Sequence, residues 1–173
     1  MDTVELDTVL ATPLGEFAGT LDNLRWAVDQ ARPEEPDGHA LVDHFQAVAD
    51  DLFALLQELS VAVGAARSTD ARQQRRALVS AQRTYARMLR RVFDDLAGFA
   101  QFAALDELAR EQPATWGAWS MGVMDALEPI PPGMALLAEA LAEGWERQPD
   151  PSGTVSLTAQ ALSAGGRAVG RVD

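Results

Sequence analysis

The residues with the strongest chemical character lie together in one short stretch of the chain. Residues 72–91 hold seven of the 14 basic residues, all of them arginine, although the formal net charge of the whole chain is −12. An arginine guanidinium stays protonated, and its planar fork pairs with carboxylates and phosphates through two hydrogen bonds at once. The stretch therefore predicts a surface that binds an anionic group.

Helical spacing places most of these arginines on one face. At about 100° per residue, five of them fall within an arc of about 60°, opposite the apolar side of the same helix. We call these five the arginine ridge: Arg72, Arg76, Arg83, Arg87 and Arg90. At about 1.5 Å per residue the ridge is somewhat under 30 Å long. Arg75 and Arg91 lie on its flanks, and we expect Asp50 and Asp51 of the preceding helix to lie level with residues 83–87.

Three interpretations of the ridge compete. Acids of the same chain can neutralise it, but exposed ion pairs contribute at most about 1 kcal/mol each, so stability explains so many arginines poorly. An acidic protein surface, on another copy or on a different protein, suits arginine well because its charge is easily desolvated. Nucleic acid or an anionic lipid is less favoured, because the rest of the molecule is negative and no nucleic-acid-binding motif accompanies the ridge.

The sequence contains few residues of the types and spacings that catalysis or metal binding requires. The chain has no cysteine, and its two histidines, His39 and His44, are five residues apart, about 140° around a helix, so they cannot share a metal. No Glu-x-x-His motif of a dimetal bundle is present. Residues 161–165 resemble a nucleophile elbow without a downstream histidine, and residues 165–171 lack the lysine of a phosphate loop. The sequence thus predicts no catalytic residue, no metal and no cofactor.

Two tryptophans give a secondary candidate. Trp116 and Trp119 are three residues apart and therefore share a helix face. Such a pair can anchor a protein partner, since tryptophan is enriched at interface hot spots. The alternative, which we favour, is that the two rings fill the wedge where a kinked segment rejoins the bundle.

The elements that carry these residues are all predicted to be helices, because apolar residues recur at alternating steps of three and four. The expected helices are approximately 14–31, 39–67, 70–111, 114–127 and 133–147, with a short last helix at 154–164. The prolines and glycine within 129–133 must break or sharply redirect the chain. The predicted fold is an all-α antiparallel bundle of four to five main helices, and the helices at 39–67 and 70–111 form its long central hairpin.

The whole chain has the length and composition of one folded domain, residues 1–173, with residues 1–12 and 165–173 expected to be flexible tails. Its N-terminus carries acids and no basic residue, unlike a signal peptide, and no apolar run reaches the length of a membrane span. We therefore expect a cytoplasmic protein. The exclusive use of arginine among basic residues and the abundant alanine are typical of a GC-rich bacterial gene.

These observations favour a non-catalytic helical-bundle module for protein–protein interaction, an adaptor or an assembly subunit. Its partner is expected to be an acidic protein surface or a second copy of the chain, bound by the arginine ridge, with Trp116 and Trp119 as the secondary site. The alternatives are a small all-α enzyme that acts on an anionic substrate with Asp or Glu and Arg, or a binder of nucleic acid or anionic lipid through the same face.

Overall fold

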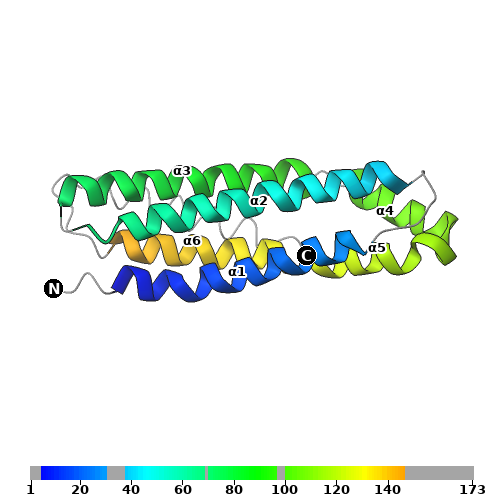
Figure 1. Ribbon diagram of the computed structural model, residues 1–173, viewed down its shortest axis with the longest axis horizontal. Helices are drawn as coiled ribbons and strands as arrows, with labels where there is room; N and C mark the ends of the chain where they lie inside the picture. Colours follow the sequence, from blue (N-terminus) through cyan, green and yellow to red (C-terminus); the bar gives the residue numbers. More distant parts are fainter. Residues whose placement is uncertain (1–4, 31–37, 69, 97–99, 147–173) are drawn as a thin grey trace.

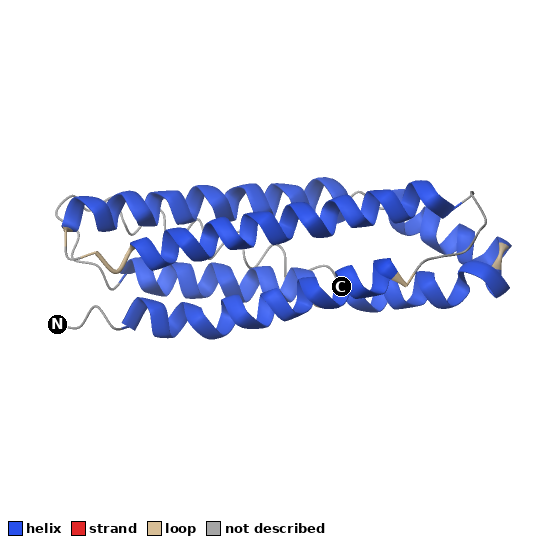
Figure 2. Ribbon diagram, in the orientation of Figure 1, coloured by secondary structure: helices blue, strands red, loops and turns tan. Residues whose placement is uncertain are grey.

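Helices account for every regular element that the structure describes. The computed structural model describes residues 5–30, 38–68, 70–96 and 100–146, and within these ranges it contains no strand (Figure 2). The helices are α1 (Glu5–Asp29), α2 (His39–Ala65), α3 (Ala71–Leu96), α4 (Ala100–Glu111), α5 (Pro113–Leu127) and α6 (Ile130–Glu146). The predicted all-α class is confirmed.

The helices form a bundle of four long rods with one short helix at an end (Figure 1). α1, α2 and α3 are three of the rods, and α5 and α6 follow one another along the fourth. Around the bundle α1 contacts α2, α2 contacts α3, α3 contacts α6, and α6 contacts α1. Successive rods run in opposite directions, so the predicted antiparallel bundle is also confirmed.

The long central hairpin is formed by α2 and α3, but the third helix is shorter than predicted. The range 70–111 is described as two helices, α3 and α4, and residues 97–99 between them lie outside the described residues. α4 packs mainly on α5, where Leu105 and Leu108 are buried. The apolar residues of α4 therefore have a packing partner of their own in α5.

The proline-rich segment interrupts the helix without turning the chain back. Glu128 keeps helical backbone angles (φ −53°, ψ −44°), and the amide of Gly133 donates to the carbonyl of Pro129 at 3.0 Å. Pro131 and Pro132 occupy the first turn of α6, where backbone amides have no partner within the helix, so their missing donors cost little. Of the two predicted outcomes, the break is confirmed, because α5 ends at Leu127 and α6 begins at Ile130, whereas the chain is not sharply redirected: α6 continues along the rod that α5 begins (Figure 1).

The first helix begins earlier than predicted. α1 starts at Glu5 and contains Pro13, so residues 5–12 are helical. Leu10 lies seven residues before Phe17, and both are buried in the core. Burial on the same face evidently outweighs the backbone hydrogen bond that a proline removes. The predicted last helix and the C-terminal tail lie outside the described residues.

Two buried contacts fix how the rods lie against one another. The phenol of Tyr85 on α3 donates to the carbonyl of Met134 on α6 at 2.9 Å, and burial raises the pKa of that phenol. Where α6 meets α1, a Cβ added at Gly133 would lie 2.6 Å from the ring of Phe17. These contacts set the axial register of α6 against both neighbours.

Candidate functional site

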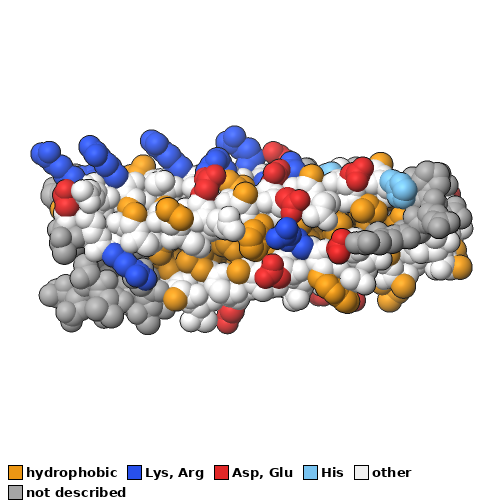
Figure 3. Space-filling model, in the orientation of Figure 1, with side chains coloured by type: hydrophobic (Ala, Val, Ile, Leu, Met, Phe, Trp, Pro, Cys, Tyr) orange, Lys and Arg blue, Asp and Glu red, His pale blue; other side chains and the backbone are white. Residues whose placement is uncertain are grey.

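The arginine ridge lies on α3, the rod with the sharpest division between an apolar and a charged face. The helix starts at a capped turn, where the carboxylate of Asp70 accepts a hydrogen bond from the amide of Arg72 at 2.9 Å. Its inward face buries Ala77, Leu78, Ala81, Tyr85, Met88 and Val92. All five ridge arginines are exposed, and basic side chains project from the edge of the molecule that α3 forms (Figure 3).

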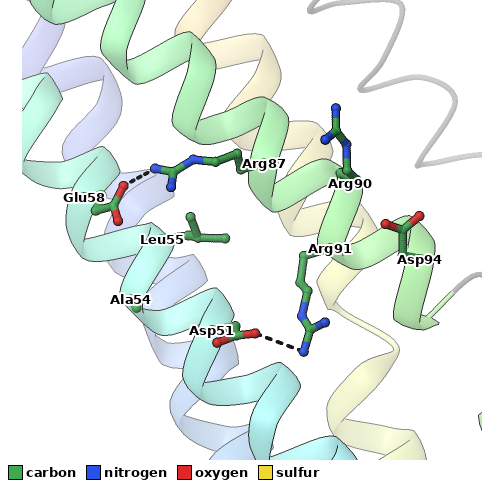
Figure 4. Close-up of a pocket in the computed structure, with 8 residues that line it drawn as sticks. All are labelled: Asp51, Ala54, Leu55, Glu58, Arg87, Arg90, Arg91 and Asp94. Carbon is green, nitrogen blue, oxygen red and sulfur yellow. Dashed lines mark hydrogen bonds and ion pairs between the residues drawn. The ribbon is translucent and has the colours of Figure 1, made fainter.

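Two ion pairs tie α3 to α2 at the C-terminal half of the ridge. The guanidinium of Arg87 pairs with the carboxylate of Glu58, and that of Arg91 pairs with Asp51 at 3.0 Å (Figure 4). Leu55 lies between the two pairs on the floor of the groove. Because all four charged side chains stay partly exposed, each pair contributes at most about 1 kcal/mol.

This pattern corrects the predicted alignment of the hairpin. Arg87 meets Glu58 rather than the expected Asp50 or Asp51, and Asp50 pairs instead with Arg25 of α1 at 3.3 Å. A helical side chain leans toward the N-terminus of its own helix, so an arginine on α3 reaches back toward the hairpin turn. It therefore meets an acid that lies closer to the hairpin turn than the Cα of the arginine does. Because of its ion pair with Glu58, Arg87 already interacts with another part of the fold.

The other four ridge arginines have no such use among the described residues. No ion pair or side-chain hydrogen bond joins them to another part of the chain that the structure describes, and they are Arg72, Arg76, Arg83 and Arg90. In Figure 4, Arg90 points away from α2 while the neighbouring Arg87 and Arg91 point across the groove. These four cations are thus presented to the surroundings rather than to the fold.

Three prominent hollows of the described surface lie along α3. Their volumes are about 350, 450 and 560 Å³, and ridge arginines contribute to the lining of each. The one nearest the start of α3 also has Val79 and Ser80 in its lining. Small-molecule sites are usually enclosed and mostly apolar, whereas these are open and have charged side chains in their lining.

The two tryptophans of the secondary site are buried. Trp116 is 0% exposed and packs edge-to-face against Trp119, with ring centroids 5.3 Å apart. The indole of Trp119 donates to the carbonyl of Val28 on α1 at 3.3 Å, and a Cβ added at Gly38 would lie 2.3 Å from the ring of Trp116. Both rings are enclosed by their own chain, so neither Trp116 nor Trp119 is exposed at the described surface.

Three residues of the site were not singled out in the sequence. Glu58 was overlooked although it stands seven residues after Asp51, two turns along the same face of α2. Val79 and Ser80 lie among the ridge arginines at helical spacing, but neither carries a charge that would attract attention. Phasing every exposed residue of α2 and α3, rather than the charged clusters alone, would have found all three.

Comparisons of the chain with protein-family models, curated proteins and solved structures found no match. Within the described helices, none is both long and apolar enough to cross a membrane. Among the same residues, no three metal-ligating side chains come together as a group that could hold an ion.

Proposed function

We propose that this protein is a non-catalytic helical-bundle interaction module, an adaptor or an assembly subunit, that binds an acidic protein surface through α3. The observation that carries the proposal is the set of four exposed ridge arginines without an ion pair to any other described residue. In a chain of net charge −12, the rest of the fold offers many carboxylates, and yet these four cations are left facing outward.

The shape and chemistry of the ridge support a protein partner. Its side chains lie along one straight helix, and the adjoining hollows contain Val79 and Leu55 beside the charges. A partner helix can place carboxylates along such a row while its apolar side chains enter the hollows. A polyanion such as nucleic acid is less suited, because the acidic remainder of the molecule repels it.

The test uses the full chain and three defined probes: an acidic helical peptide, a single-stranded oligonucleotide, and vesicles that contain anionic lipid. We expect the peptide to bind at low salt and to be released at high salt, since exposed charges are then screened. Replacing Arg72, Arg76, Arg83 and Arg90 by glutamate should weaken peptide binding at least tenfold.

A single-charge control is Arg110→Glu on α4, compared with Arg76→Glu on the ridge: both change the net charge equally, but only Arg76→Glu should weaken peptide binding. Preference for the oligonucleotide or the vesicles over the peptide would contradict the proposal and favour the anionic polymer or lipid. Peptide binding that survives the four ridge substitutions would show that α3 is not the binding face.

A further inference from the structure

A second surface of the same chain has the complementary charge and the same length as the ridge. The outer face of the α5–α6 rod carries four exposed carboxylates, which we call the acidic stripe: Asp125, Glu128, Glu139 and Glu143. Counted at about 100° per residue through Glu128, whose backbone angles are helical, the four positions fall within an arc of about 60°. This stripe faces away from the core, as the ridge does.

The spacing of the stripe repeats that of the ridge in the reverse direction. Arg72, Arg76, Arg87 and Arg90 are separated by 4, 11 and 3 residues. Read backwards from Glu143, the acids are also separated by 4, 11 and 3 residues. Both rows extend over 18 residue steps, about 27 Å of helix at about 1.5 Å per residue, so two antiparallel helices can align these four arginines with the four acids, while Arg83 falls opposite Pro132.

The same alignment brings apolar residues together at its centre. It places Arg76 opposite Glu139 and Arg90 opposite Asp125, and Val79 then faces Leu136. Leu136 is 49% exposed, one of few large apolar side chains at the described surface, and Val79 is partly exposed. An apolar contact flanked by ion pairs is the usual anatomy of a protein interface.

The two surfaces cannot meet within one molecule. Both point away from the core of the bundle, and no ion pair found for the described residues joins a ridge arginine to α5 or α6. Their complementarity is therefore available only between copies. We infer that the partner of the arginine ridge is the acidic stripe of a second copy of this chain, docked antiparallel with Val79 against Leu136.

This inference rests on the proposed function and names its partner. The main test is sedimentation velocity of the full chain at low and at high salt. We expect association at low salt and a monomer at high salt. The ridge variant Arg76→Glu/Arg90→Glu should be monomeric at low salt, and so should the stripe variant Asp125→Arg/Glu139→Arg, because like charges then face each other.

Mixing the two variants gives the sharpest result. Each ridge then finds a stripe of opposite charge on the other variant, so the mixture should associate although neither component does alone. A control variant, Glu16→Arg/Asp22→Arg on α1, changes the charge equally but lies off the stripe. It should not restore association when mixed with the ridge variant.

Cysteine cross-linking tests the register directly, because the natural chain has no cysteine. A mixture of Val79→Cys and Leu136→Cys variants should oxidise to a covalent heterodimer at low salt, since the two positions face each other in this alignment. Val61→Cys, at a position 74% exposed on α2, replaces Val79→Cys in the control and should give only background cross-linking.

The outcomes separate this inference from the proposed function. If the wild-type chain stays monomeric at low salt but still binds the acidic peptide through its ridge, the inference that the partner is a second copy is wrong. The proposed interaction module is then unaffected. Loss of both association and peptide binding overturns both. Association that persists in the ridge variant places the contact elsewhere and also overturns the inference.

Discussion

The tryptophan pair on α5 and the arginine ridge on α3 are both candidate binding sites in the sequence. In the folded structure the tryptophans are buried, whereas the ridge arginines are exposed. Trp116 and Trp119 are enclosed by α1 and by Gly38 at the start of α2. The side chains of four ridge arginines, in contrast, form no ion pair with another described residue. Substituting a side chain that is packed in the core lowers the stability of the fold, whereas an exposed side chain can be used to bind a partner.

The largest loss of stability is expected when the buried ring at Trp116 is removed. Trp116→Ala leaves a cavity beside Gly38 and should lower the free energy of unfolding by about 3–5 kcal/mol, measured by urea denaturation. Trp26→Ala is the matched control, because Trp26 is 67% exposed, and its effect should stay within about 0.5 kcal/mol. Equal losses of stability in the two variants would contradict the burial of Trp116 in the core.

A smaller loss is expected where α6 approaches α1. In Gly133→Ala the new methyl would lie 2.6 Å from the buried ring of Phe17, so the core must shift, at a cost of about 1–3 kcal/mol. Gly122→Ala on α5 meets nothing within 4 Å and should instead stabilise the protein by about 0.5–1 kcal/mol. Thermal unfolding should therefore show a lower melting temperature for Gly133→Ala and a higher one for Gly122→Ala.

Tyr85 makes the stability of the folded core depend on pH. Tyr85→Phe removes the hydrogen bond to Met134 and should cost about 1 kcal/mol at neutral pH. Burial raises the pKa of this phenol, so folding is favoured while it is protonated, and that stability is lost as the pH rises above about 10, the pKa in the unfolded chain.

The composition makes this alkaline effect easy to assign. Tyr85 is the only tyrosine, and the chain has no lysine or cysteine, so no other side chain titrates near pH 10. Urea denaturation between pH 8 and pH 11 should show falling stability in the wild type and a flatter profile in Tyr85→Phe. An equally steep fall in the variant would mean that the phenol is not the group responsible.

The smallest effect on stability is expected at the ridge itself. Replacing Arg72, Arg76, Arg83 and Arg90 by glutamine should change the free energy of unfolding by about 0.5 kcal/mol or less per substitution. Arg91→Gln, which breaks the pair with Asp51, should cost up to about 1 kcal/mol and serves as the comparison. A large loss in the fourfold variant would show that the ridge stabilises the fold and is not a surface kept for a partner.

Much of this architecture is legible in the sequence because the helical period is strong. The three–four rhythm predicted α2 almost to its ends, and the same phasing separated the charged and apolar faces of α3. The start of α1 was predicted too late, and the sequence left open whether the prolines break the helix or sharply redirect the chain. Proline penalties are local, whereas the burial of Leu10, and of Ile130 beside Pro131, depends on neighbours distant in the chain.

The sequence by itself determined the helical class, the amphipathic phasing of α3 and the position of the arginines on its outer face, because these follow from periodicity along one element. The tertiary structure decided the order of neighbours around the bundle, the pairing of Arg87 with Glu58 and the burial of Trp116 and Trp119. Each of these depends on which helix lies opposite and at what height, and only packing between rods sets that register.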